Sequence, residues 1–476
     1  PDPIPTDGTG PAGGTGPTDG RLDAALRDGP HSLLHLLRAL PPAAPPGAAE
    51  HREPTTLLVV SLQATDGSVP APRPERALLT GLLGSLARER PDLRVRHVDL
   101  DRISHTPGDA DVSSSLDPVV DALVGELNSA QNEPVVAYRD RRRHVRRLTG
   151  ALSVPAAAPT RAVFRPDRLY LVSGGAGGLG ALVSRHLLAE VGARLLIVGR
   201  APGPWAPSPD AAGTPERDQA DDARADARRS VLRELARLGP VRYACLDVRD
   251  GDGLRRAVAT AERELGAELA GVVHLAGSFE QRPLAEYTPA QFDAAIAAKV
   301  LGALALHRLV EHRADAVFVS FSSLNGYFGG ATVGAYSAAN SFLDALAHTQ
   351  RQASGLRAAS LAWSGWDRIG MTTGGAAGQL SAARGYQTLG PREGMDSMRA
   401  ALAFAAAHVL IGLDPAKAWP RSQLAEPTQA RRRLVARVTP ADGGPGGPAA
   451  LSAALAELDP VLADPYGIDT GTSLVM

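Results

Sequence analysis

One turn of the chain combines several glycines at a spacing that suits the binding of a phosphate group. The segment SGGAGGLG, residues 173–180, lies between an apolar run typical of a strand and a run typical of a helix. Glycines let the backbone turn tightly and approach a pyrophosphate, which rests at the positive N-terminus of the helix. The sequence therefore predicts a dinucleotide site, the alternative being a glycine-rich connection without a ligand. The predicted contacts are Gly174, Gly175, Ala176, Gly178, Leu179 and Gly180.

Arg200 ends the next predicted strand after this turn, where the two nicotinamide cofactors are distinguished. An NAD site usually has Asp or Glu there, which holds the ribose 2′-hydroxyl. An arginine instead offers a cationic group to a 2′-phosphate. We therefore predict NADPH as the cofactor, the alternative being a solvated arginine. Asp247 and Val248 end the third predicted strand, where an adenine ring would lie.

The elements that must position these residues alternate along the second half of the chain. Their nearly continuous apolar runs are typical of parallel strands that are buried on both faces. A polar, Pro-rich stretch at 201–229 is predicted as a surface loop that leads into a helix. The pattern predicts a Rossmann-like, doubly wound α/β sheet. Its strands are expected at 169–174, 195–200, 243–248, 271–277, 316–323 and 358–365.

The first half repeats the alternation without a glycine fingerprint. Strands are expected at 57–62 and 95–100, with helices at 33–40, at 76–90 and near 116–128. This half is predicted to be a parallel sheet with helices packed on it and without a nucleotide site. The arginine-rich stretch 139–147 is interpreted as a solvated strand and turn, the alternative being a surface for an acidic carrier protein.

Composition excludes several classes of protein. The 476 residues carry a net charge of −1, which argues against general nucleic-acid binding. The single cysteine, Cys245, excludes an intrachain disulfide and a cysteine-based metal cluster, and we expect a reducing, cytoplasmic setting. No apolar run approaches the ~18 residues of a membrane span, and the N-terminus does not read as a signal peptide. The missing initiator Met suggests a piece of a longer chain. We expect no metal site.

A second group of motifs carries a resemblance to a known family. Over residues 30 to 425, the chain resembles the ketoreductase region of modular polyketide synthases, in the short-chain dehydrogenase/reductase superfamily. The motifs are HLAG (274–277), AAKVLGALALH (297–307), FSSLNGYFGGATVGAYSAANSFLDALA (321–347) and LAWSGW (361–366). In most of the superfamily a lysine follows the tyrosine by four residues. In these ketoreductases an asparagine takes that place and the lysine lies upstream, as Asn340 and Lys299 do around Tyr336.

The resemblance implies a catalytic set made of Lys299, Ser323, Tyr336 and Asn340. Tyr336 would protonate the ketone oxygen while NADPH donates hydride to the carbonyl carbon. Lys299 would lower the pKa of Tyr336 and bind the nicotinamide ribose, beside cofactor contacts from Ala276 and Gly277. Ser323 would hold the carbonyl oxygen, with Ser320 and Ser322 as competing candidates, and Asn340 would support the lysine and a relay water. Lys299 is one of two lysines among 50 basic residues, and arginine could not readily replace its compact ammonium.

The chain departs from the family at two stereochemical markers. Ser278-Phe279-Glu280-Gln281 stands where one class has Leu-Asp-Asp, and Phe328 stands where another class has tryptophan. The configuration of the product hydroxyl is therefore not predicted. The Gly-rich stretch 372–390 is predicted as a lid, the alternative being an ordinary surface loop. The expected substrate and lid residues are Glu280, Gln281, Phe328, Trp366 and Met371.

The resemblance implies an organisation in four parts. They are a linker at 1–20, a truncated, cofactor-free Rossmann-like structural subdomain at 21–165, a catalytic NADPH-binding subdomain at 166–430 and a C-terminal linker or flanking segment at 431–476. We expect reduction of the β-keto group of an acyl thioester tethered to a carrier protein. The alternatives are an α-ketoacyl thioester in a depsipeptide-type nonribosomal synthetase, a catalytically silent scaffold domain and a free-standing reductase. The expected partners are an acyl or peptidyl carrier protein and other domains of the same megasynthase, with neither nucleic acid nor membrane.

Overall fold

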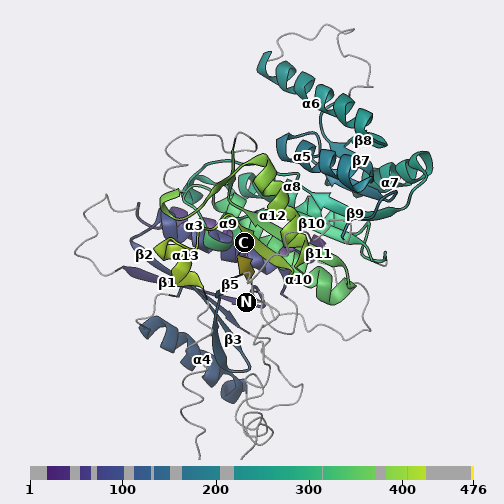
Figure 1. Ribbon diagram of the computed structural model, residues 1–476. Helices are drawn as coiled ribbons and strands as arrows, with labels where there is room; N and C mark the ends of the chain where they lie inside the picture. The colour runs from purple at the N-terminus through teal and green to yellow at the C-terminus, as the bar shows by residue number, and fades with distance from the viewer. Residues whose placement is uncertain are drawn as a thin grey trace, which may run out of the picture.

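A computed structural model gives the fold of the chain (Figure 1). Met371, the first 18 residues and most of the segment from 431 onward lie outside the described residues, so their predictions are untested. The structure describes residues 19–42, 54–65, 72–100, 112–129, 133–150, 163–203, 219–313, 315–367, 369, 382–404, 406–424 and 473–475.

The nine-stranded sheet is built mainly from the second half of the chain, and β5 joins it from the first half. Its strand order is β5-β15-β14-β11-β10-β9-β6-β7-β8, and all its strand pairs are parallel. The order reverses between β6 and β9, so their carboxyl ends form the crevice where such sheets bind ligands. This confirms the predicted doubly wound fold. The strands are β6 (Leu169–Ser173), β7 (Arg194–Gly199), β8 (Val241–Cys245), β9 (Leu269–His274), β10 (Val317–Ser323), β11 (Arg357–Trp363), β14 (His408–Ile411), β15 (Ser473–Val475) and β5 (Leu148–Gly150).

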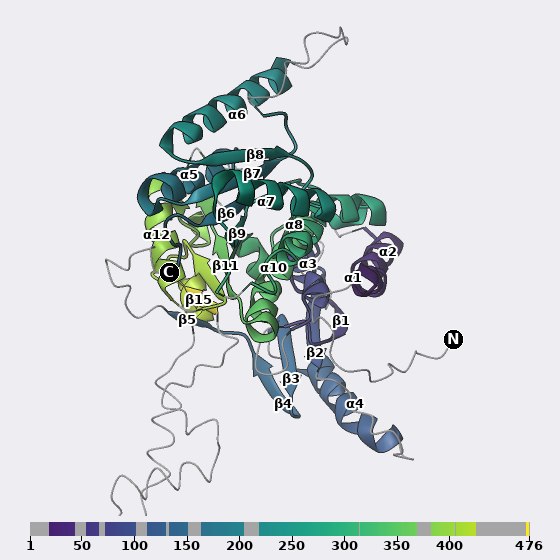
Figure 2. The same ribbon diagram turned by 90° about the vertical axis from the view of Figure 1, so that its right-hand side faces the viewer.

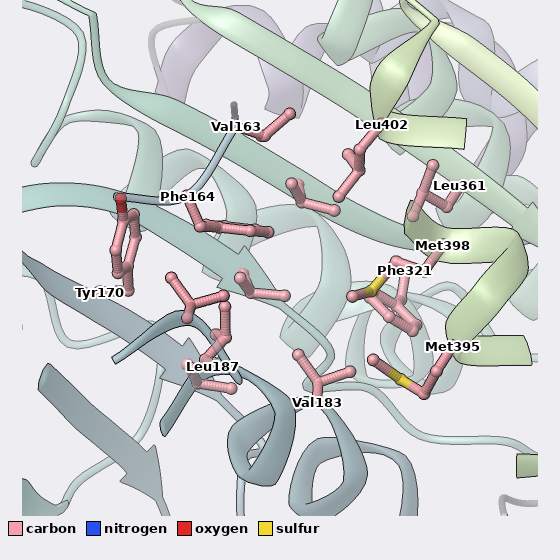
Figure 3. Close-up of a cluster of buried hydrophobic side chains, with 14 of the residues drawn as sticks. Val163, Phe164, Tyr170, Val183, Leu187, Phe321, Leu361, Met395, Met398 and Leu402 are labelled. Carbon is pink, nitrogen blue, oxygen red and sulfur yellow. The ribbon is translucent and has the colours of Figure 1, made fainter. Parts of the chain in front are cut away.

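Helices cover both faces of this sheet, which explains the unbroken apolar runs of its strands. On one face, side chains from α5, the π-helical turn after it and α12 meet over the sheet, as Figure 3 shows for Val183, Leu187 and Met398. On the other face, α7 packs on the strands beside α8 and α10. The helices are α5 (Gly178–His186) with its extension (Leu187–Val191), α6 (Gln219–Leu238), α7 (Gly251–Leu265), α8 (Pro289–His307), α9 (Leu324–Phe328), α10 (Gly334–Ser354), α12 (Pro391–Ala403) and α13 (Ala418–Gln423).

Helix α8 is long and apolar enough, by length and composition alone, to cross a membrane. In this fold it is a core helix: 56% of its apolar window is buried, and Phe292, Val300 and Leu306 are covered almost completely. It carries Lys299 on its buried side.

The first half forms the smaller sheet, in the order β1-β2-β3-β4, below the larger one in Figure 2. Its first three strands are parallel, and β4 returns antiparallel to β3. A truncated parallel sheet is therefore present as predicted. Its elements are β1 (Thr55–Leu62), β2 (Leu93–Leu100), β3 (Val135–Arg139) and β4 (Arg142–Val145), with helices α1 (Asp19–Leu26), α2 (Ser32–Ala39), α3 (Pro74–Glu89) and α4 (Val112–Asn128).

The arginine-rich stretch 139–147 is largely the solvated strand and turn that the sequence predicts, with residues 140–144 exposed. Within it, Arg143 pairs with the buried Glu126 at 2.6 Å. Arg139 is the exception: it is buried and pairs with Asp99 at 2.5 Å. The prediction was wrong at Arg139 because a strand pattern rich in arginine does not show which acidic partners the fold brings to it.

The two halves share one hydrophobic core. Helix α3 of the first half packs along α10 of the second, and both contribute leucines to the same buried cluster. The helices approach closely at Gly81, where an added Cβ would lie 2.5 Å from the carbonyl carbon of Ser337. Ser85 Oγ also donates to Ser337 Oγ at 2.9 Å. The first half therefore sets the position of α10, which carries the predicted catalytic tyrosine.

Candidate active site

The glycine turn joins β6 to α5 at the crevice of the sheet. Gly174 has a φ of +75°, in the region that favours glycine. A Cβ on Gly180 would lie 2.6 Å from the Cα of Gly175, so only glycine lets α5 begin so close to the strand. No side chain caps the N-terminus of α5, and Gly177 and Gly178 are exposed. The turn therefore fits the pyrophosphate of a dinucleotide, which can approach the first amides of the helix.

A buried serine ties the glycine turn to the neighbouring strand. Ser173 Oγ is 2.7 Å from His274 Nδ1 and accepts hydrogen bonds from the amides of Leu275 and Ala276. His274 Nε2 lies 3.1 Å from the carbonyl oxygen of Lys299. Because that carbonyl can only accept, Nε2 carries the proton and Nδ1 accepts from Ser173. Burial lowers the pKa of His274 to about 3, so the ring is neutral. This network fixes the HLAG segment, and the sequence reasoning missed it.

The residues predicted for the adenine end lie where the strands β7 and β8 finish. Arg200 directly follows β7 and is exposed. Asp247 lies two residues beyond β8, which ends earlier than predicted, and makes a bidentate pair with Arg249. That hydrogen bonding lowers the pKa of Asp247, and the charge of Arg200 acts in the same direction. Val248 is buried against Gly302 of α8.

Tyr336 lies in the first turn of α10, beside the end of β10. Burial raises the pKa of its hydroxyl, while hydrogen bonding by Ser323 and Asn340 acts against that rise. Ser323 also caps α9, accepting from the amide of Asn325 at 3.2 Å. Ser322 is turned elsewhere and donates to the carbonyl oxygen of Asn340. Of the three candidate serines, Ser323 is therefore the one brought to Tyr336.

Lys299 reaches the same place from α8. It is buried and passes so close to Gly277 that an added Cβ there would lie 2.9 Å from Lys299 Cε. Its Nζ donates to the carbonyl oxygen of Phe321 at 2.7 Å and lies 5.7 Å from the centroid of the Tyr336 ring. Burial lowers the pKa of Lys299 to about 8, opposed by the charge of Asp344.

The electrostatics correct one expectation. We expected Lys299 to lower the pKa of Tyr336, but burial dominates and raises it. The lysine is directed at Phe321 and lies beside the tyrosine ring rather than in a hydrogen bond with its hydroxyl. A raised pKa keeps the hydroxyl protonated at neutral pH, as a proton donor requires.

Asn340 takes the place one helical turn after Tyr336. Its Nδ2 donates to the carbonyl oxygen of Tyr336 at 2.8 Å. Its Oδ1 is buried and has no hydrogen-bond partner among the described residues. One turn further, Asp344 accepts from Ser360 Oγ at 2.6 Å. A buried acceptor without a partner suits a bound water.

Comparison with known proteins identifies the family. Residues 169–368 match the family model described as the KR domain. The chain is 34% identical over 391 residues to erythronolide synthase EryA3 of Saccharopolyspora erythraea, an alignment that covers 80% of this chain and 11% of that protein. Residues 169–368 are therefore a ketoreductase (KR) domain of the kind found in type I polyketide synthases.

Solved structures agree with this ketoreductase assignment. A C2-type ketoreductase from a modular polyketide synthase has a TM-score of 0.64 and 26% identity, covering 83% of this chain and 75% of that one. The multidomain structure of a keto acid-selecting nonribosomal peptide synthetase module, with adenylation, ketoreductase and pseudo-Asub parts, has a TM-score of 0.68 and 26% identity. It covers 87% of this chain and 32% of that one.

The predicted substrate residues of the ketoreductase fall into two groups. Glu280 and Gln281 are exposed on the loop after β9, where the neighbouring Phe279 meets the Tyr336 ring edge-on at 5.2 Å. Phe328 is buried against Trp419, with ring centroids 4.5 Å apart. Trp366 is likewise buried, against Trp363 and Gly394. Substrate contact by Phe328 or Trp366 stays a prediction that this packing does not favour.

Proposed function

We propose that the chain is an NADPH-dependent ketoreductase that reduces a keto group on an acyl thioester tethered to a carrier protein. When bound, NADPH supplies the hydride. Arg200, exposed directly after β7, supports the choice of the phosphorylated cofactor. The chain spans about a tenth of the length of erythronolide synthase EryA3. We therefore also propose a cytoplasmic megasynthase, with further domains and a carrier protein, as its setting.

The chain's own residues then have separate tasks. Tyr336 donates the proton to the ketone oxygen, and Ser323, hydrogen-bonded with it, orients that oxygen. Lys299 offers its buried ammonium to the cofactor ribose beside the tyrosine ring. Asn340 Oδ1 accepts a hydrogen bond from the water that returns a proton to the site. The glycine turn and the N-terminus of α5 hold the pyrophosphate.

One observation carries the proposal: Ser323 and Lys299 meet Tyr336 next to an open glycine turn. Its test is Tyr336→Phe, with Tyr138→Phe in the first half as the matched control. We expect kcat for a ketone thioester to fall by about 10²–10⁴-fold in Tyr336→Phe, with unchanged NADPH affinity. Retained turnover would remove Tyr336 from the acid role. A wild-type protein that binds NADPH but reduces no ketone would favour the scaffold alternative.

The charge of Lys299 gives the reaction an alkaline limit. Because its pKa is lowered to about 8, the ammonium is lost as the pH rises through that value. We expect kcat/KM to decline above about pH 8, measured by NADPH oxidation between pH 6 and 10. Lys299→Met should be slow at every pH and lack this decline. A wild-type profile that is flat to pH 10 would contradict the role.

An α-ketoacyl thioester is the second candidate substrate. The observation in its favour is the likeness to the keto acid-selecting module, which spans 87% of this chain at a TM-score of 0.68. Mass spectrometry after incubation with carrier-bound α- and β-ketoacyl groups separates the two. A mass gain of two hydrogens on only one carrier-bound acyl group identifies the substrate class.

A further inference from the structure

Glu89 is an acid in an unfavourable place. It is the last residue of α3, where the negative end of the helix dipole favours cations and opposes a carboxylate. It is half-buried, and burial raises the pKa of its carboxyl against two backbone hydrogen bonds. A carboxylate kept under these conditions needs partners that compensate for them.

Those partners are the backbones of two loops of the catalytic half. Glu89 Oε2 accepts from the amide of Leu284 at 2.7 Å, and Oε1 accepts from the amide of Thr332 at 2.9 Å. Leu284 ends the loop that follows β9, and Thr332 lies in the turn just before α10. One side chain of the first half thus joins two segments that lie 48 residues apart in the second, between Leu284 and Thr332.

The two loops also contact each other. The amide of Arg282 donates to the carbonyl oxygen of Thr332 at 2.7 Å. The backbones of Arg282 and Val333 also form an isolated parallel β-bridge. Leu284 packs on Gly334, where a Cβ would lie 2.7 Å from its Cγ. Thr332 has a φ of +63°, which costs energy for a β-branched residue and persists only where its surroundings hold it. Its amide is held by Glu89 and its carbonyl by Arg282.

This joint lies next to the reacting residue. Tyr336 is four residues after Thr332, and Phe279, on the loop that ends at Leu284, packs on the Tyr336 ring. The exposed Glu280 and Gln281 belong to the same loop. Any loosening of the joint therefore moves Phe279 and its neighbours relative to the proton donor, while the glycine turn remains fixed by Ser173 and His274.

We propose that Glu89 is a positioning residue that joins the loop after β9 to the turn before α10 and so fixes the side from which a ketone approaches Tyr336. The inference rests on the proposed reductase function. A prochiral ketone offers two faces, and a fixed loop admits one of them. Glu89 therefore controls substrate affinity and the ratio of the two alcohol stereoisomers without touching the substrate.

The test compares Glu89→Gln with Glu286→Gln, which removes the same charge from an exposed acid near the joint. Glutamine has nearly the same shape, but its amide nitrogen cannot accept, so one loop amide loses its partner. For a ketone thioester we expect KM to rise by about tenfold and kcat to stay within about twofold. We also expect a larger share of the minor alcohol isomer by chiral chromatography, and an unchanged NADPH Kd.

Two results would overturn the proposal. One is a KM and an isomer ratio in Glu89→Gln that equal those of Glu286→Gln. The other is a parallel loss of kcat and NADPH affinity, which would indicate general loosening of the fold. If the wild-type protein reduces no ketone, the proposed function fails, and amide hydrogen exchange still tests the joint. Faster exchange over 279–288 and 329–336 in Glu89→Gln alone supports it, and equal exchange in both variants rejects it.

Discussion

The two halves of the molecule share a strand–turn–helix unit, and they differ in the partners of the backbone amides that follow the strand. In both units the helix begins without a side-chain cap, at α5 after β6 and at α3 after β1. After β1, the carboxylate of Asp99 accepts from the amides of Ala64 and Thr65 at 2.8 and 3.0 Å. Ser61 and Arg139 donate to the same carboxylate.

This difference teaches that the fold alone does not make a nucleotide site. In the first half an internal carboxylate bonds two amides directly after the strand, and a buried arginine balances its charge. In the second half the turn consists of small residues, and Gly177 and Gly178 are exposed. Whether such a turn can accept a phosphate thus depends on what already satisfies a few backbone donors.

The largest expected effect comes from filling the open turn. In Gly180→Val the new side chain meets the backbone of Gly175, so α5 must shift away from the strand. We expect NADPH affinity, measured by fluorescence titration, to fall by more than about 100-fold. The matched change in the first half is Gly125→Ala, where an added Cβ meets nothing within 4 Å. It should leave NADPH affinity unchanged and raise stability by up to ~1 kcal/mol. Equal NADPH affinities in the two variants would contradict the assignment of NADPH binding to the glycine turn.

The next effect tests the internal anion of the first half. Asp99→Asn leaves the buried Arg139 without its counter-charge, and should lower the free energy of unfolding by about 3–5 kcal/mol, measured with urea. NADPH affinity of the folded protein should not change. The control is Glu234→Gln, which breaks the exposed pair with Arg185 and should cost less than about 1 kcal/mol. A similar small loss in both variants would show that Asp99 has no special role.

Each half contains a buried histidine with a lowered pKa, so acid should reduce the stability of the protein. Burial lowers the pKa of His97 in the first half to about 4 and that of His274 in the second to about 3. The unfolded chain binds these protons near pH 6.5 and the folded protein does not, so stability falls as the pH drops below that value. We expect a loss of about 2 kcal/mol per histidine between pH 7 and 5. His97→Gln and His274→Gln should each flatten this dependence, and the exposed His144→Gln should not.

The smallest effect concerns the choice of cofactor. Arg200→Ala should reduce the preference for NADPH over NADH by about tenfold, because one charge-assisted contact to a 2′-phosphate is lost. The neighbouring Arg249→Ala is the control, since Arg249 pairs with Asp247 and should change both affinities alike. The ratio of kcat/KM for the two cofactors measures this. An unchanged ratio in Arg200→Ala would show that Arg200 is a solvated side chain that does not contact the cofactor.

Sequence reasoning succeeded where a local pattern carried the information. The glycine turn between a strand and a helix and the doubly wound parallel sheet follow from periodicity and spacing. The set of Lys299, Tyr336 and Asn340 came from the family resemblance, and the structure brings these residues together with Ser323. The resemblance also favoured Ser323 over Ser320 and Ser322, and in the structure Ser322 is turned away, toward the carbonyl oxygen of Asn340.

The rest depended on contacts between distant segments. Asp99 lies in a strand pattern, VRHVDL, that gives no sign of the amides it meets. Glu89 looks like an ordinary polar residue at the end of an amphipathic helix, and its two partners lie about 200 residues further along the chain. The pKa of Tyr336 was mispredicted because spacing reveals neighbours in sequence but does not show how deeply a hydroxyl is buried.

The close crossing of α3 and α10 has a consequence for engineered synthases. Gly81 and Ser337 meet backbone to backbone, and Ser341 Oγ of α10 bonds the carbonyl of Ala77 in α3. A chimera that exchanges only the catalytic half at a junction between β5 and β6 replaces α10 and keeps α3. The two helices would then come from different parent proteins, although their backbones are in close contact at Gly81 and Ser337. Recombination is better placed before α1, so that both helices travel together.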